Sequence, residues 1–241
     1  MKGIFITGTD TGVGKTLITT LIAIGLSELG YSVTLRKPIE TGCKPEGSIL
    51  IPEDGMFYIK NIPSLKKEKI DDITPIRFKE PLCPLAASRI EKTQISWENI
   101  ITSLKSVETS KILMVEGVGG VMVPITEGRF VYDLIIELQL PVIVVCGNRL
   151  GAINHTLLTL DFLKARKISV IGIIINHTDL ADTLAHKTNP AIIAELSSGV
   201  PIIGTIPYIS EISAESLKDV SKKYINYDII QGYLQSDDIT K

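Results

Sequence analysis

A lysine and a threonine end a glycine-rich stretch, GTDTGVGKT, at residues 8–16. The stretch lies between a largely apolar run at 3–7 and another at 17–26, so a turn between a first strand and a first helix is expected. Such a turn aims several backbone N–H groups at one point, and the helix dipole favours an anion there. Lys15 would then reach the outer phosphates of a nucleotide, and the Thr16 hydroxyl would bind Mg²⁺. The alternative interpretation is a tight turn with a solvated lysine.

The spacing of this loop differs from the common phosphate-binding pattern by one residue. That pattern has four residues between its first glycine and its Gly-Lys-Thr, whereas five separate Gly8 from Gly14. Strand, glycines, Gly-Lys-Thr and helix still follow one another in order, so we interpret the stretch as a longer variant of the loop. The residues expected to bind the nucleotide are Gly12, Val13, Gly14, Lys15, Thr16 and Leu17.

A carboxylate follows the apolar run at 111–115. Glu116 stands where P-loop proteins place the acid that holds magnesium, although aspartate is commoner there, and Gly117, Val118 and Gly119 come next. Glycines let the backbone approach a ligand closely. We therefore expect Glu116 to be a metal ligand and residues 117–119 to contact the nucleotide. An acidic residue that opens a hairpin is the alternative.

A second lysine, Lys37, closes the run at 32–36. It follows the carboxyl end of a predicted strand, as Lys15 does, so the two charges should meet at one edge of the sheet. A cation there could stabilise the negative charge that develops during phosphoryl transfer. Taken alone, Lys37 could also be a solvated strand end, and Asp54 a carboxylate in a turn.

Two further polar segments follow predicted strands. Asn176 begins an Asn-His-Thr-Asp sequence that matches the spacing with which GTP-binding proteins read guanine, but His177 replaces the usual lysine. We interpret Asn176 as a contact of the base and leave Asp179 open. Gly151 to Asn154 begin a helix whose free N–H groups could bind a second anion such as a carboxylate. Helix capping alone is the alternative.

Six short runs rich in β-branched residues must position these groups, at 4–7, 32–36, 111–115, 141–146, 169–175 and 200–206. Because they are continuously apolar, they predict strands covered on both faces, as in a parallel sheet. Helical patterns lie between them, at 17–29, at 97–107 and after residue 150. This alternation predicts an α/β fold of the P-loop NTPase type, with a doubly wound, mostly parallel sheet and helices on both faces. The chemical groups follow the carboxyl ends of different strands, the edge where such sheets bind ligands.

Length and composition limit the remaining possibilities. The 241 residues are 44% hydrophobic, which suits a single domain over 1–241 with a partly irregular excursion at 38–84. The tail after residue 210 is polar, and we expect it to be helical with a frayed end. A net charge of −2 argues against nucleic acid as a partner. No apolar run has the roughly 18–20 residues that cross a bilayer, and three scattered cysteines suit a reducing cytosol. We expect a cytoplasmic protein that binds no membrane.

Five motifs resemble the dethiobiotin synthetase family. They are GTDTGVGKT at 8–16 with its longer spacing, RKPIETG at 36–42, VEGVGG at 115–120, LGAINHTLLT at 150–159 and IIINHTD at 173–179. The resemblance extends from residue 1 to about residue 210. It implies a ligase of biotin biosynthesis that uses ATP and Mg²⁺ to close a cyclic urea on 7,8-diaminononanoate with CO₂. In that family one amine forms a carbamate, ATP phosphorylates it, and the second amine closes the ring and expels phosphate.

The resemblance also implies roles for individual residues. Thr16, Asp54 and Glu116 would hold the metal, with Asp54 and not Glu53 chosen by its spacing from Lys37. Lys15 and Lys37 would be catalytic, because the carbamate oxygen and the γ-phosphate repel each other and need nearby cations.

Substrate and base contacts follow in the same way. Thr11 and Thr41 would touch the diamine, while the base would be bordered by Asn176, His177, Ile206, Pro207 and Tyr208. The family forms homodimers, in which Gly151 and Asn154 would bind the substrate carboxylate in the site of the other subunit.

Three other classes of P-loop protein are alternatives. A regulatory ATPase of the partitioning type carries a second lysine at the start of the loop, which residues 8–12 lack. A GTP-binding switch would have a lysine where His177 stands, and an amidoligase of the cobyrinate kind would need an added glutaminase domain. Preference among ATP, GTP and CTP stays open, because Gly12 replaces the glutamate of some relatives and Asp179 is extra.

Overall fold

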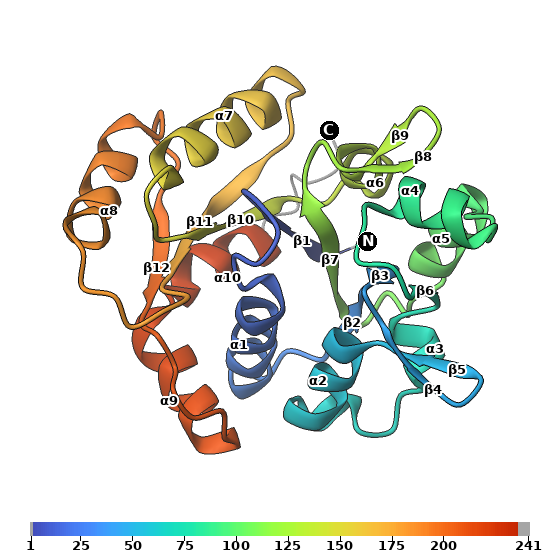
Figure 1. Cartoon of the computed structure of the whole chain (residues 1–241). Coiled ribbons are helices and arrows are strands. Elements are labelled where there is room, and N and C mark those ends of the chain that lie inside the picture. The colour runs from blue at the N-terminus through green and yellow to red at the C-terminus, as the bar shows by residue number, and fades with distance from the viewer. Residues whose placement is uncertain (1, 236–241) are drawn as a thin grey trace.

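A central sheet of six parallel strands organises the protein, whose computed structural model describes residues 2–235. The strand order is β12-β11-β10-β1-β7-β2 (Figure 1). The bounds are β1 (Gly3–Gly8), β2 (Val33–Arg36), β7 (Ile112–Gly120), β10 (Val142–Gly147), β11 (Val170–Asn176) and β12 (Ile202–Ile206). These strands are the six apolar runs of the sequence, so the predicted parallel sheet is confirmed.

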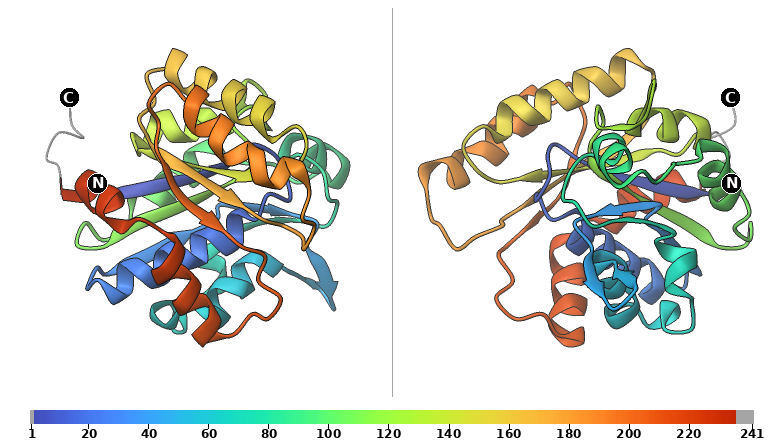
Figure 2. Two further views of the ribbon diagram at one scale, coloured as in Figure 1. Left: turned by 90° about the vertical axis from the view of Figure 1, so that its left-hand side faces the viewer. Right: turned by 45° about the vertical axis from the view of Figure 1, so that its right-hand side comes forward.

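Helices cover both faces of this sheet, and alternate strand residues point to opposite faces. Ile4 and Ile6 join one apolar cluster, whereas Phe5 between them joins the other. One face carries α1 (Lys15–Glu28), α2 (Glu53–Asn61), α9 (Ala214–Tyr224) and α10 (Tyr227–Gln235). The other carries α5 (Trp97–Lys105), α6 (Val131–Leu138), α7 (Ala152–Ala165) and α8 (Leu184–Leu196) (Figure 2). The doubly wound arrangement and the predicted helices α1, α5 and α7 are confirmed.

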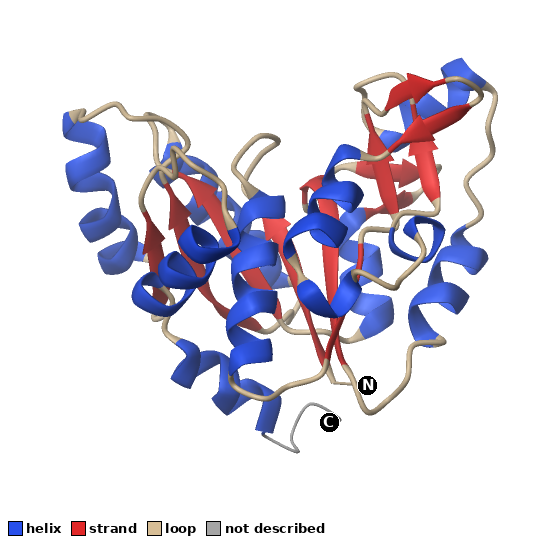
Figure 3. Cartoon of the chain, turned by 90° about the horizontal axis from the view of Figure 1, so that it is seen from below, coloured by secondary structure: helices blue, strands red, loops and turns tan. Residues whose placement is uncertain are grey.

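The segment 38–84 contains short elements beside the central sheet (Figure 3). β3 (Ile39–Thr41) pairs in parallel with β6 (Ile76–Phe78), and β4 (Lys44–Glu46) forms a hairpin with β5 (Ile49–Ile51). Helix α2, a 3₁₀ turn (Pro63–Leu65) and α3 (Ile70–Ile73) lie between them in the chain. After this segment come α4 (Pro84–Glu91) and the small hairpin of β8 (Pro124–Thr126) and β9 (Arg129–Phe130). The segment returns the chain to the sheet edge, so α2 can contribute to a site there.

Helices α9 and α10 lie in the part of the tail that the structure describes, where the sequence led us to expect helix. The frayed end expected from the sequence concerns residues 236–241, which lie outside the described range. Within residues 2–235, no helix combines the length and the apolar character needed to span a bilayer.

A tyrosine of α10 packs closely against α1. The Tyr227 hydroxyl donates to the carbonyl oxygen of Leu21 at 3.0 Å and shares a hydrogen bond of 2.7 Å with Ser221. A Cβ atom on Gly25 of α1 would overlap the Tyr227 ring and hydroxyl. The two C-terminal helices, α9 and α10, therefore pack against α1, and the lack of a side chain at Gly25 leaves room for Tyr227.

We expect Gly25→Ala to lower the free energy of unfolding by about 1–3 kcal/mol, because the added methyl overpacks the contact with Tyr227. Gly232→Ala is the matched control, since Gly232 lies exposed in α10 and an added Cβ would meet nothing within 4 Å. There the alanine should raise the free energy of unfolding by roughly 0.5–1 kcal/mol. Urea unfolding of both variants measures the difference, and a shift of both in the same direction would contradict the packing explanation.

Candidate active site

A cleft of about 570 Å³ opens at the carboxyl edge of the sheet. The loop after β1 lines it with Gly12, Gly14, Lys15, Thr16 and Leu17. The remaining predicted residues in its wall are Thr11, Lys37, Thr41, Asp54, Glu116, Val118 and Gly119. Residues from five separate stretches of the chain thus face one space, as the parallel topology requires.

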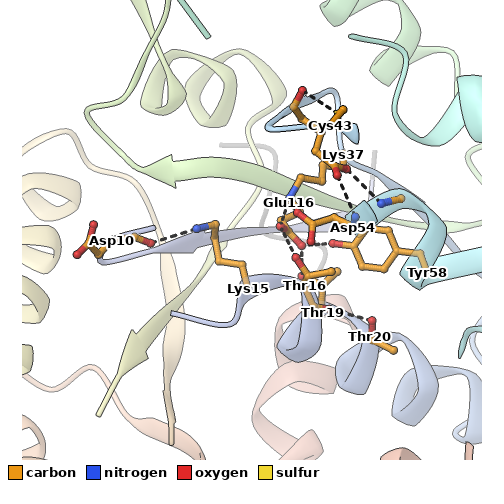
Figure 4. Close-up of polar contacts among 12 residues, drawn as sticks. Asp10, Lys15, Thr16, Thr19, Thr20, Lys37, Cys43, Asp54, Tyr58 and Glu116 are labelled. Carbon is orange, nitrogen blue, oxygen red and sulfur yellow. Dashed lines mark hydrogen bonds and ion pairs between the residues drawn. The ribbon is translucent and has the colours of Figure 1, made fainter. Parts of the chain in front are cut away.

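Glu116 lies at the centre of the polar contacts in this region (Figure 4). Its side chain is buried, and each carboxylate oxygen accepts two hydrogen bonds. Oε1 accepts from Thr16 Oγ1 at 3.2 Å and from Lys37 Nζ at 2.7 Å. Oε2 accepts from Thr19 Oγ1 at 3.2 Å and from the Tyr58 hydroxyl. A buried carboxylate is costly unless it is paired in this way.

Strand β7 continues past Glu116 to Gly120, so the strand does not end at residue 115 and Glu116 does not open a hairpin. Glu116 is still paired with Ile6 of β1, whereas the pairing with β2 stops at Val115. A Cβ on Gly117 would press against the Phe5 ring, and Gly117 is not among the described residues that line the cleft. Val118 and Gly119 do line it, so the structure brings these two of the three residues to the cleft.

Lys37 lies between two carboxylates. Its ammonium donates to Glu116 and to Asp54, and its side chain is buried. Burial lowers the pKa of Lys37, but Glu116 and Asp54 raise it, and the net shift is upward. Burial likewise raises the pKa of Asp54, but Lys37 holds it below its usual value. Lys37, Asp54 and Glu116 therefore form two ion pairs that share the lysine. Asp54 lies in the first turn of helix α2 and not in a loop turn.

Lys15 faces the same cleft but has a different partner. Its ammonium donates to the carbonyl oxygen of Asp10 at 3.1 Å, within its own loop. Burial lowers the pKa of Lys15. The Asp10 carboxylate pairs with Arg149 at 2.6 Å, which ties the phosphate-binding loop to the chain after β10. Lys15 at the start of α1 and Lys37 after β2 thus line the same cleft, at the edge of the sheet where the sequence predicted that they meet.

Asn176, the first of the residues expected to contact the base, lies against the glycine loop of residues 8–16. Asn176 ends β11 and donates through Nδ2 to the Val13 carbonyl oxygen at 3.0 Å. Its buried Oδ1 has no hydrogen-bond partner among residues 2–235. A Cβ on Gly14 would overlap the Asn176 amide, which explains a glycine there. Asn176 thus supports the loop and still has a free acceptor.

The other predicted base contacts are close in the chain to this asparagine. The His177 N–H donates to the Ile206 carbonyl oxygen at 2.9 Å, and Pro207 and Tyr208 follow directly, with Tyr208 41% exposed. Burial lowers the pKa of His177. Asn148 Nδ2 lies 3.2 Å from His177 Nε2. A neutral ring nitrogen can accept this hydrogen bond, so the amide orients the imidazole.

Gly151 and Asn154 stand at the start of α7, away from the other predicted residues. Gly151 has a φ of 94° and precedes the first helical residue, and Asn154 is exposed. Neither is among the described residues that line the cleft. Their predicted substrate contact is therefore not made within this chain's own cleft.

The donor set near Glu116 fits Mg²⁺. Thr16, Asp54 and Glu116 offer oxygen atoms, and Mg²⁺ prefers one or two carboxylates together with phosphate oxygens. No group of three or more histidine, cysteine or acidic residues within residues 2–235 could hold a metal ion by itself. A nucleotide would therefore have to supply part of the coordination.

Comparison with known proteins decides the family. The family model described as an AAA domain matches residues 2–216. ATP-dependent dethiobiotin synthetase BioD of Thermodesulfovibrio yellowstonii is 44% identical over 236 residues, which cover 94% of this chain and 96% of that protein. The chain belongs to the dethiobiotin synthetase family. The protein of the same name from Bacillus licheniformis is 36% identical, with 98% of both chains covered.

Solved structures share the fold of this dethiobiotin synthetase family member. The ParA family ATPase of Chlorobium tepidum is similar with a TM-score of 0.52 and 18% identity, covering 98% of this chain and 100% of its own. The MinC:MinD cell division complex of Aquifex aeolicus gives a TM-score of 0.52 at 13% identity, covering 92% and 95%. Such distant likeness confirms the P-loop NTPase type of fold alone. The alternative of a regulatory partitioning ATPase is not favoured, because the relatives that are 34–44% identical are synthetases.

Three residues that sequence reasoning did not select complete the site. Glu40 of β3 is buried and accepts from the backbone N–H groups of Asp54 at 3.0 Å and Gly55 at 3.2 Å. It thereby caps the start of α2, where N–H groups lack partners within the helix. Thr19 and Tyr58 donate to Glu116. Helical spacing was the available signal: Thr19 follows Thr16 by one turn, and Tyr58 follows Asp54 by one turn.

Glu40 should make stability depend on pH. Burial raises the pKa of Glu40 from 4.5 to about 7, although Lys37 opposes the shift. A carboxyl group with a raised folded pKa contributes stability that is present below its unfolded pKa and is lost as pH rises through the folded pKa. Between these values the free energy of unfolding should fall by up to about 1.4 kcal/mol per pH unit because of Glu40.

Glu40→Gln should remove this slope, whatever constant offset the loss of one acceptor adds. Urea unfolding between about pH 5 and about pH 8 measures the difference between variant and wild type. Glu46→Gln, which changes an exposed carboxylate of β4, is the control and should run parallel to wild type. Parallel curves for Glu40→Gln as well would show that Glu40 does not take up the proton.

Proposed function

We propose that this protein is an ATP-dependent ligase of biotin biosynthesis that joins 7,8-diaminononanoate and CO₂ into the ureido ring of dethiobiotin. The names of its relatives support this activity. The observation that carries the proposal is the meeting of two lysines, two carboxylates and a threonine hydroxyl at one cleft beside the glycine loop. Such a site suits the transfer of a phosphoryl group to an anionic acceptor.

Each step of the reaction suits a cleft that contains two lysines. One amine adds to CO₂ and loses a proton, which forms a carbamate. A carbamate oxygen then bonds to the γ-phosphorus and the bond to ADP breaks. The second amine attacks the carbamoyl carbon, the bond to phosphate breaks, and a proton leaves the nitrogen. Lys15 and Lys37 would offset the repulsion between carbamate and phosphate. Bound Mg²⁺, held by Thr16, Asp54 and Glu116, would supply further positive charge at the phosphates.

The free acceptor of Asn176 supports ATP as the nucleotide. Its Oδ1 has no partner among the described residues, so it suits the exocyclic amino group of adenine. Guanine presents an oxygen at the equivalent position, which would face another acceptor. The segment 206–208 would border the base beside His177. We therefore propose selection against GTP at Asn176.

We also propose that the protein works as a cytoplasmic homodimer. The N–H groups at the start of α7, near Gly151 and Asn154, would bind the diamine's carboxylate in the partner's cleft, because they do not face the cleft of their own chain. Thr11 and Thr41 would touch the diamine from within the cleft. The three free cysteines suit a reducing compartment.

Incubation with the diamine, bicarbonate, Mg²⁺ and ATP tests the proposed activity. Mass spectrometry should detect dethiobiotin, and phosphate should be released in step with it. ATP hydrolysis that proceeds at the same rate with and without the diamine, with no new product, would contradict the proposal and favour a regulatory ATPase.

Lys37→Ala should lower turnover by roughly 10²–10³-fold while nucleotide affinity changes little, because the Lys37 charge is needed most when phosphate meets the carbamate. Steady-state kinetics and nucleotide binding measure the two effects separately. Lys44→Ala is the control, since Lys44 is exposed on β4 and pairs with Glu53. Equal losses of turnover and affinity in Lys37→Ala would contradict a catalytic role.

A further inference from the structure

Tyr58 is a fully buried side chain of α2 whose hydroxyl points at Glu116 (Figure 4). The hydroxyl donates to Glu116 Oε2, and Thr19 of α1 donates to the same oxygen at 3.2 Å. Neither Tyr58 nor Thr19 is among the described residues that line the cleft. They therefore act on Glu116 from behind and touch neither the nucleotide nor the substrate.

The two oxygens of Glu116 have different surroundings. Within residues 2–235, Oε2 accepts from the hydroxyls of Tyr58 and Thr19, which are buried. Oε1 accepts from Thr16 and Lys37, which line the cleft. The last torsion of a glutamate side chain is broad, so the plane of its carboxylate can rotate when nothing holds it. The two donors on Oε2 fix that plane and so keep one oxygen of Glu116 aimed at the cleft.

Helix α2 connects this contact to the second carboxylate of the site. Asp54 and Tyr58 are four residues apart and lie on one face of the helix. Glu40 anchors the first turn of the same helix through the N–H groups of Asp54 and Gly55. The Tyr58 contact therefore fixes α2 against β7 and with it the separation of Asp54 from Glu116.

The Tyr58 hydroxyl stays protonated under ordinary conditions. Burial raises the pKa of Tyr58, and the carboxylates of Glu116 and Asp54 raise it further.

We propose that Tyr58, with Thr19, is a positioning residue that holds Glu116 Oε1 toward the cleft and thereby sets the affinity of the site for a divalent cation. This inference rests on the proposed function, because the cation is the one that would accompany ATP.

The test is divalent-cation binding by Tyr58→Phe, which removes one oxygen and keeps the ring. Binding of Mn²⁺ is measured by the EPR signal of the free ion, with a non-hydrolysable ATP analogue present. The Mn²⁺ dissociation constant should rise about 10-fold, as for other residues that orient a metal ligand. Affinity for the ATP analogue in the presence of a chelator should stay within about twofold of wild type.

Tyr227→Phe is the matched control, because it also removes a tyrosine hydroxyl that is hydrogen-bonded inside the protein, but at a residue that does not line the cleft. Its Mn²⁺ affinity should equal that of wild type even where its thermal stability falls. Thr19→Val should weaken Mn²⁺ binding less than Tyr58→Phe, and Thr19→Ser should restore it because the hydroxyl returns. The Thr19 pair tests the inference independently should Tyr58→Phe fail to fold.

The outcomes separate the inference from the proposed function. Mn²⁺ affinity that is unchanged in Tyr58→Phe, or lowered equally in Tyr227→Phe, overturns the positioning role. In the Thr19 pair, equal affinities for the valine and serine variants also overturn it. Failure of the wild-type protein to bind Mn²⁺ with the ATP analogue overturns the proposed function instead.

Discussion

The ion pairs of Lys37 with Asp54 and Glu116 are the interaction on which the rest of the site depends. Lys37 and Glu116 are almost completely buried, and charges removed from water cost several kcal/mol each unless they are paired and hydrogen-bonded. The hydroxyls of Thr16, Thr19 and Tyr58 satisfy the remaining positions around Glu116. Because these groups come from different elements, a shift of any one element would leave a buried charge without its partner.

The charge of the cleft explains why a metal suits it. Two lysines, Lys15 and Lys37, line the cleft together with four acidic residues, so the cleft has no surplus positive charge for a triphosphate. The acidic residues are Glu40, Glu53, Asp54 and Glu116. A divalent cation would supply positive charge and would use Asp54 and Glu116 as ligands. With the carboxylates taken up by the metal, the ammonium of Lys37 would be available to phosphate. The same residues thus pair with one another in the absence of a ligand and would bind metal and phosphate in its presence.

The sequence predicted the six strands of the central sheet, because strands that are buried on both faces are continuously apolar. They also predicted the edge at which Lys15, Lys37 and Glu116 meet, because parallel strands share their carboxyl ends. The predicted end of β7 was wrong. Glu116 and the glycines after it interrupt the apolar pattern, but the backbone pairing with β1 continues. Glu40 escaped notice because its partners lie in α2 and leave no local signal. Tyr58 left only its helical spacing from Asp54, because its partner Glu116 is distant in the sequence. The roles of the site residues stay predictions.

The segment 38–84 shows how such long-range contacts create local structure. Two of its prolines stand at element boundaries: Pro52 directly precedes α2, and Pro63 begins the 3₁₀ turn. A helix as short as the nine residues of α2 is marginal by itself in water. Glu40 at its start and the contact between Tyr58 and Glu116 supply what its sequence lacks. The buried carboxylates therefore stabilise the very helix that brings Asp54 to the cleft, so this part of the fold and the site form together.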